Sequence, residues 1–158
     1  MSIFKTIWQR LKNAFLSLQT YDVLSPDFKQ RRQVNRMLRS RPAPNLNKWF
    51  NSYYQPIGIA PSVAAFAYSY LEKYSGLRIA RVLPSDRLEA DLHWTEVCWF
   101  DWENRLCEDF WHCFGADLSD HLEDFDPYTV ADLLEFLNCQ LPQNSRFRKD
   151  NKSDNIWL

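Results

Sequence analysis

The stretch TEVCWFDWENRLCEDFWHCFG, from Thr95 to Gly115, predicts the centre of an all-helical fold. On a helical wheel of about 100° per residue, its apolar side chains fill an arc of roughly 180°. We therefore expect one long amphipathic helix. The centre of its predicted buried face comprises Trp99, Trp102, Leu106 and Phe110. An arc this wide indicates burial against two neighbours: the rest of a helical bundle, and either the N-terminal segment or a partner.

The polar side of the same helix is acidic and predicts a binding site for a basic protein surface. Arg105 follows Asp101 and precedes Asp109 by four residues each, so we expect it to bridge both carboxylates. Glu103 is an acid inside the apolar arc, which indicates either pairing with a base of the N-terminal arm or a contact site. The predicted partner-binding residues are Asp101, Glu103, Glu108, Asp109 and Trp99.

Metal binding and catalysis are disfavoured by spacing. Cys98, Cys107 and Cys113 point in divergent directions from one helix, so they cannot converge on a metal ion. His112 lies about 21 Å along the helix axis from Cys98, too far for a nucleophile and its base. No glycine-rich phosphate loop is present in the sequence. We expect no metal, no cofactor and no enzymatic activity.

The flanking segments predict further helices. Residues 61–76 have apolar positions at helical spacing and end at Gly76, and a long loop follows to Trp94. Near the other end, Thr129 and Asp132 form a capping-box pattern ahead of a last short helix. Residues 47–62 are expected to form an aromatic connector, punctuated by Pro56 and Pro61.

Three short motifs in this order resemble acyl carrier proteins over about residues 60–139. PSDRLEADL (84–92) is similar to the carrier loop, FGADLSD (114–120) to the exit of the second carrier helix, and YTVADLLEFL (128–137) to the last carrier helix. The resemblance implies a small helical bundle that presents an acidic second helix to basic partners. Carriers bear phosphopantetheine on a Ser at the start of that helix. Here the two ways of aligning that position fall on Glu96 and Phe100, and Thr95 is the nearest hydroxyl.

The N-terminal part is basic, whereas the remainder is acidic. Residues 1–50 carry ten Lys and Arg against two acids, and residues 84–137 carry fifteen acids against two bases. Within residues 3–18 an apolar stripe is edged by bases, which is typical of a helix that lies on an anionic membrane or covers its own domain. The residues of this stripe and its edges are Ile3, Phe4, Lys5, Ile7, Trp8, Arg10, Leu11, Lys12 and Phe15.

A second basic helix is predicted after Ser25, which we expect to cap it, and before Pro42. Its bases are expected to spread widely around the helix; they comprise Lys29, Arg31, Arg32, Arg36 and Arg39. Such a cluster suits phosphates, but the acidic remainder of the chain would repel nucleic acid. We therefore expect three parts: a basic helical arm at 1–45, a carrier-like acidic helical domain at 46–140, and a polar mobile tail at 141–158.

These patterns favour a non-enzymatic interaction protein, an adaptor or assembly factor that docks on a basic partner. An acidic inhibitor or immunity-type protein that blocks a basic active site, and a diverged acyl carrier protein, remain alternatives. The sequence shows no membrane-spanning apolar run and no signal peptide, and its four cysteines lack paired spacing. We expect a cytoplasmic protein, either free or peripheral on the cytoplasmic side of a membrane.

Overall fold

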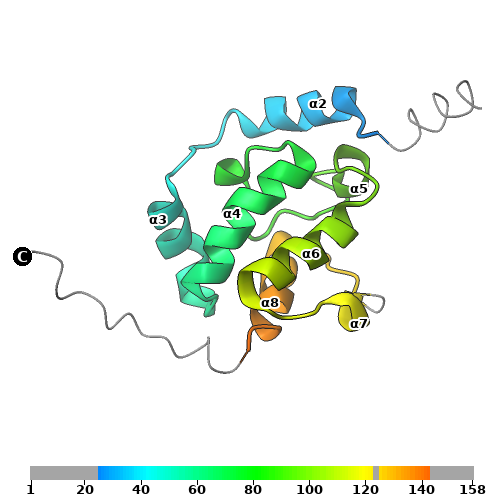
Figure 1. Ribbon diagram of the computed structural model, residues 1–158. Coiled ribbons are helices and arrows are strands. Elements are labelled where there is room, and N and C mark those ends of the chain that lie inside the picture. The colour runs from blue at the N-terminus through cyan, green and yellow to red at the C-terminus, as the bar shows by residue number, and fades with distance from the viewer. Residues whose placement is uncertain (1–24, 123–124, 143–158) are drawn as a thin grey trace, which may run out of the picture.

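The computed structural model describes residues 25–122 and 125–142. Across these residues the chain is mostly helical, and its only β-type pairing is an isolated bridge between Arg87 and Thr129. Figure 1 shows a small bundle in which α4 (Pro61–Ser75) runs through the middle and packs against α8 (Val130–Cys139). The predicted all-α class and small helical bundle are confirmed.

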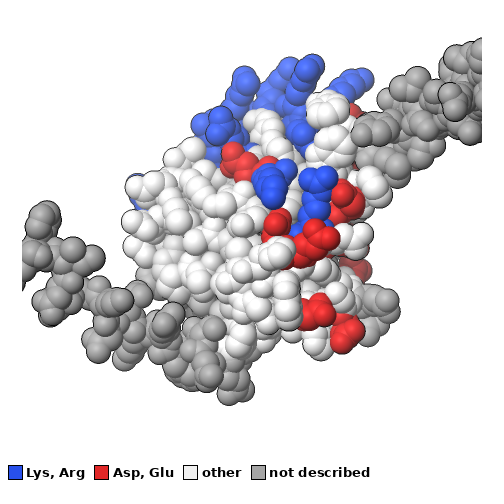
Figure 2. Space-filling view, in the orientation of Figure 1, with Lys and Arg blue, Asp and Glu red and all other residues white. Residues whose placement is uncertain are grey.

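The first described helix, α2 (Phe28–Leu38), lies along one side of the bundle. It begins at Asp27, whose carboxylate accepts hydrogen bonds from the backbone N–H groups of Lys29 and Gln30 at 2.9 Å. The prediction that Ser25 caps this helix was therefore wrong. The N-cap is Asp27, which directly precedes the helix and whose carboxylate accepts from the N–H groups of its first turn. Val34 and Leu38 are buried, so this part of the predicted arm packs on the body. Figure 2 shows basic side chains projecting from this side of the molecule.

Residues 46–57 are helical, which corrects the expected aromatic connector. Helix α3 (Leu46–Trp49) continues into a π-helical turn, η1 (Phe50–Tyr54), and a 3-10 turn, η2 (Gln55–Ile57). Trp49 and Tyr54 are fully buried, with ring centroids 4.4 Å apart. Burial of these two large rings outweighs the weak helical preference of the aromatic residues.

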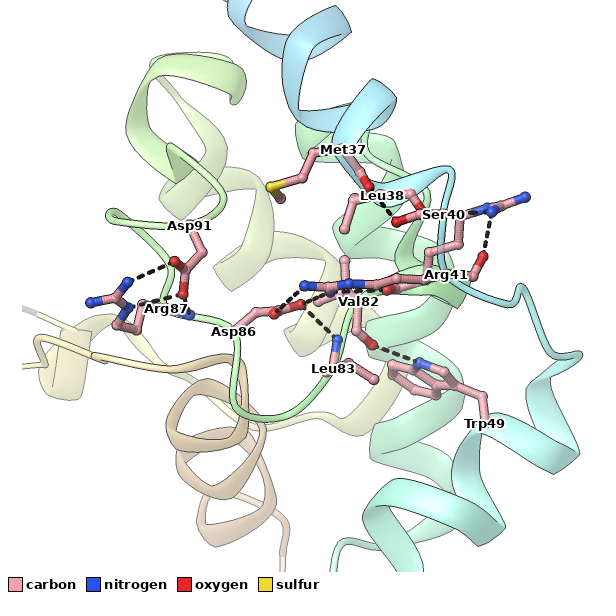
Figure 3. Close-up of polar contacts among 11 residues, drawn as sticks. Met37, Leu38, Ser40, Arg41, Trp49, Val82, Leu83, Asp86, Arg87 and Asp91 are labelled. Carbon is pink, nitrogen blue, oxygen red and sulfur yellow. Dashed lines mark hydrogen bonds and ion pairs between the residues drawn. The ribbon is translucent and has the colours of Figure 1, made fainter.

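The loop that follows α4, residues 76–93, is held by polar contacts to α2 and α3 (Figure 3). Arg41, just beyond α2, donates two hydrogen bonds to the buried carboxylate of Asp86, at 2.6 and 3.0 Å. The indole N–H of Trp49 donates to the carbonyl of Val82 at 3.3 Å. Arg81, in the 3-10 turn η3 (Ile79–Arg81), donates to the carbonyls of Arg39 and Arg41 and so satisfies the end of α2.

The predicted long helix is two helices, α5 (Trp94–Val97) and α6 (Trp102–Phe114), with a break at residues 98–101. In a continuous helix the carbonyls of Glu96 and Val97 would accept from the backbone of the next turn. Instead Glu96 accepts from the N–H of Asp27 at 2.8 Å, and Val97 accepts from the Arg31 guanidinium at 2.6 and 3.2 Å. The start of α2 therefore takes over the hydrogen bonds that would have continued α5.

The last part of the bundle follows the sequence prediction more closely. A short helix, α7 (Ser119–Leu122), comes after α6, and α8 begins with a capping box formed by Thr129 and Asp132, as predicted. The inner face of α8 is fully buried and comprises Val130, Leu133, Leu134 and Leu137. This face and α4 enclose the core on which α6 lies.

Candidate docking surface on helix α6

Helix α6 has a narrow buried face. Leu106 and Phe110 are fully buried, and the Phe110 ring lies edge-on to Phe66 of α4 at 5.4 Å. Trp102 is only half-buried and packs edge-on against Trp94 at 5.8 Å. Trp99 lies in the break before α6 and is also half-buried. The predicted core-facing set is therefore correct for Leu106 and Phe110 but too wide at its N-terminal end.

Asp109 is engaged inside the molecule. Its carboxylate accepts a hydrogen bond of 2.6 Å from the hydroxyl of Tyr74 and lies 3.4 Å from the ammonium group of Lys73. Burial, followed by this bond to Asp109, raises the pKa of Tyr74 far above its ordinary value. The Asp109 side chain is only 21% exposed, so little of its charge is offered to a partner.

Arg105 binds one of its two predicted acids. Its Nε donates to Asp101 at 2.9 Å, as the four-residue spacing predicts. The predicted bridge from Arg105 to Asp109 was wrong. The carboxylate of Asp109 binds Tyr74 and Lys73 of α4 instead. Asp101 and Asp109 thus belong to a neutralised strip along the contact between α6 and α4.

Glu103 and Glu108 differ from those two acids. Both side chains are exposed, and neither has an ion-pair partner among the residues that the structure describes. They line a hollow between α6 and α7 whose other residues are Asn104, Cys107, Ser119 and Leu122. Figure 2 shows acidic side chains gathered on the side of the molecule that carries α6 and α7.

Trp111 completes this face. It follows Cys107 by four residues and Glu108 by three, which places it one turn further along the same side of the helix. Its side chain is 54% exposed, although its neighbour Phe110 is fully buried. We use the name α6 docking surface for five residues: Glu103, Asn104, Cys107, Glu108 and Trp111.

Trp111 was not predicted as part of this surface, because residues 97–114 form a single apolar arc only if they are drawn as one continuous helix. On the wheel of that continuous helix Phe100 lay only about 20° from Trp111, so Trp111 counted as the edge of an apolar arc that included Trp99 and Phe100. The break at residues 98–101 removes those two from the helix. The remaining buried face centres on Leu106 and Phe110, and Trp111 lies about 100° away from Phe110. A large apolar residue outside a narrow buried stripe was the signal that could have identified it.

The basic residues of α2 fall into two groups. Arg31 faces the body, where its guanidinium donates to the carbonyl of Val97. Burial lowers the pKa of Arg31 from its ordinary value. The other four occupy an outward arc of roughly 80° at 100° per residue, so the expected wide spread was wrong. This group, which we name the basic face, comprises Lys29, Arg32, Arg36 and Arg39.

The cysteines and histidines of the described residues do not assemble into a reactive centre. No group of three His, Cys, Asp or Glu side chains suited to a metal ion occurs there. Cys98 is buried, which raises the pKa of its thiol well above the ordinary value, and burial also raises the pKa of Cys107. Cys113 and Cys139 are exposed.

The predicted arm at residues 3–18, with its stripe from Ile3 to Phe15, lies outside the described residues, as does the tail beyond residue 142. In the part of the chain that is described, no helix combines the length and apolar character needed to cross a membrane.

Comparison of the chain with family models, with curated proteins and with solved structures found no match in any of the three.

Proposed function

We propose that the protein is a non-enzymatic interaction module, an adaptor or assembly factor, that docks on a basic surface of another protein through the α6 docking surface. One observation carries this proposal. Glu103 and Glu108 are exposed without counter-ions among the described residues, and the exposed Trp111 lies one turn beyond Glu108. The acids that do have internal partners, Asp101 with Arg105 and Asp109 with Lys73, line a second hollow that Glu108 also borders.

The chemistry of this surface suits arginine or lysine side chains of a partner. A guanidinium group can form charge-assisted hydrogen bonds with a glutamate while its plane stacks on an indole ring. Trp is among the residues that contribute most to binding when it is buried at an interface, and acids at the rim guide association and exclude wrong partners. Glu103, Glu108 and Trp111 together provide both kinds of contact.

The resemblance to acyl carrier proteins supports the same surface. The described elements from α4 to α8 are a helix, a loop with the 3-10 turn η3, the two helices α5 and α6, the short helix α7, and α8. In carriers the second helix presents acids to basic partners, and the resemblance implies that α5 and α6 together do so here. The positions aligned with the carrier serine are Glu96 and Phe100, so the proposed function keeps the docking and omits the pantetheine arm.

We further propose a cytoplasmic location. None of the four cysteines forms a disulfide, and exposed thiols such as Cys113 are compatible with a reducing compartment. Residues 3–18 would then either cover the body or bring the protein to the cytoplasmic side of a membrane. Deleting residues 1–20 should lower either the melting temperature or the binding to anionic vesicles. An unchanged melting temperature together with unchanged vesicle binding would contradict both proposed roles of residues 3–18.

The proposed function is tested by affinity capture with three variants. We expect Glu108→Lys and Trp111→Ala each to lose the partner that the wild-type chain retains. Glu135→Lys is the matched control, because Glu135 is an exposed acid on α8 and its reversal changes the net charge equally. Equal capture by the wild type, Glu108→Lys and Trp111→Ala would contradict the proposal. If the captured partner were an enzyme that the chain inhibits, the inhibitor alternative would replace the adaptor.

A further inference from the structure

The outward side of α2 carries a row of positive charges. Lys29, Arg32, Arg36 and Arg39 are exposed and point away from the buried side that contains Val34 and Leu38. Four bases within roughly 80° of arc make a continuous basic strip along an eleven-residue helix. This basic face is the strongest local concentration of one charge on α2.

The basic face has no acidic partner within the described chain. Other arginines nearby are occupied: Arg31 by the carbonyl of Val97, Arg41 by Asp86, and Arg81 by carbonyls at the end of α2. The four residues of the basic face take part in none of the ion pairs among the described residues. Figure 2 shows basic side chains gathered on the side of the molecule that carries α2. These charges are therefore available to an external anion.

Exposed apolar side chains lie at both edges of this strip. Phe28 is 52% exposed and shares a hollow with Arg32, Arg36 and Arg39, while Met37 is 45% exposed on the other side. A basic strip bordered by exposed apolar groups is typical of helices that lie in the interface of an anionic membrane. Long basic side chains reach the headgroups, and the apolar residues enter the boundary beneath them. A site for single-stranded nucleic acid would instead be expected to offer several aromatic platforms for bases, and Phe28 is the only aromatic residue of α2.

The position of α2 fits this role. Figure 1 shows α2 along one side of the bundle and α7 at the opposite end. A membrane that binds α2 would leave the α6 docking surface turned away from the lipid. The acidic body would also be repelled by anionic headgroups, which favours the same orientation.

We propose that the basic face of α2 binds the anionic headgroups of a membrane surface, with Phe28 and Met37 at the apolar boundary. This inference goes beyond the proposed function, because it concerns a different surface and a different class of ligand. It holds whether or not the α6 docking surface binds a protein.

Vesicle flotation of the full-length chain tests the inference. The probes are phosphatidylcholine vesicles with and without phosphatidylserine, compared over a salt series. Each base near an anionic surface contributes about a fivefold factor, so Arg32→Gln with Arg36→Gln should lower partitioning roughly 30-fold. Lys29→Gln with Arg39→Gln is a second, independent pair with the same expected effect. Lys48→Gln with Lys73→Gln is the matched control, since it removes two positive charges from exposed lysines outside α2.

The inference is supported if both α2 pairs lose binding to phosphatidylserine vesicles, the control pair retains it, and added salt weakens wild-type binding. Circular dichroism should show equal helix content in all variants, because these side chains are exposed. Wild-type binding by both α2 pairs would overturn the inference, and so would an equal loss in the control pair. A labelled DNA duplex is the competing probe. Loss of duplex binding in the α2 pairs, with vesicle binding unchanged, would assign the basic face to nucleic acid instead.

Discussion

At the scale of single residues, Asp109 and Glu108 are neighbours on α6 with opposite roles. Asp109 binds the hydroxyl of buried Tyr74 at 2.6 Å, whereas Glu108 is exposed without an ion pair among the described residues. Asp109→Ala should therefore lower the free energy of unfolding by about 1.5–3 kcal/mol, the range for a hydrogen bond to a charged group. Glu108→Ala should stay within about 0.5 kcal/mol of the wild type.

Urea unfolding of the two alanine variants provides the measurement. Equal stabilities would show that the Tyr74 bond contributes nothing and that both acids belong to one solvated surface. The same contrast explains why charge reversal at Asp109 is a poor test of docking: it would disturb the fold as well as the surface.

Cysteine chemistry provides a second test at this scale. Burial raises the pKa of Cys98, so its thiol stays protonated and protected at mildly alkaline pH, where the thiolate is the reactive form. We expect iodoacetamide to modify exposed Cys113 and Cys139 first and to reach Cys98 only after unfolding. Peptide mapping by mass spectrometry follows each site. Native-state labelling of Cys98 at the rate of Cys113 would contradict the packing of α5.

At the scale of elements, the order of helices was predictable but the break in the central one was not. Local signals fix α4 and α8: Gly76 takes a left-handed conformation after α4, and Thr129 with Asp132 caps α8. The break at residues 98–101 depends on Arg31, which lies 66 residues earlier in the chain and binds the carbonyl of Val97. No periodicity in residues 95–115 contains that information, so the sequence predicted Glu108 on the exposed side but misplaced Trp99 and Trp111.

Two arginine–aspartate ion pairs hold the loop after α4, one with a buried aspartate and one at the surface (Figure 3). The Asp86 side chain is 7% exposed and joins Arg41 to the backbone N–H of Leu83, whereas Asp91 pairs with Arg87 at the surface. Asp86→Ala should lower stability by about 3 kcal/mol, the lower end for a buried pair, because Arg41 stays partly exposed. Asp91→Ala should have a much smaller effect, since solvent screens that pair.

Acid titration provides a further test of the Arg87–Asp91 pair. Hydrogen bonds from Arg87 lower the pKa of Asp91 to about 2. A carboxylate with a lowered pKa stabilises the fold above its unfolded pKa, and this contribution is lost as pH falls toward 2. The small stability difference between wild type and Asp91→Ala should therefore shrink in acid. A difference that grows below pH 4 would contradict the assignment of the Arg87–Asp91 pair.

At the scale of the whole molecule, the carrier resemblance leads to a negative prediction. Neither Glu96 nor Phe100 can accept a phosphopantetheine arm, and the hydroxyl of Thr95 donates to Glu89 at 2.8 Å. Incubation with a phosphopantetheinyl transferase and coenzyme A should leave the intact mass unchanged, with an authentic acyl carrier protein as the positive control. A mass increase equal to one phosphopantetheine would restore the carrier alternative.

The molecule as a whole separates its unpaired charges. The basic face lies on α2, and the α6 docking surface lies toward α7. Among the described residues, the basic N-terminal part forms an ion pair with the acidic body through Arg41 and Asp86. The charge split was visible in the sequence. Which acids stay unpaired was not, because Tyr74 and Lys73 of α4 select Asp109 only in the folded chain.

The association rate with the captured partner tests the central claim most directly. Stopped-flow mixing over a salt series compares the wild type, Glu103→Lys with Glu108→Lys, and the control Glu135→Lys. Because interface charges mainly set the association rate, the double variant should associate roughly tenfold more slowly at low salt, with a flatter salt dependence. The control should follow the wild type. Wild-type rates for the double variant at every salt concentration, with unchanged circular dichroism, would contradict the assignment of partner binding to α6.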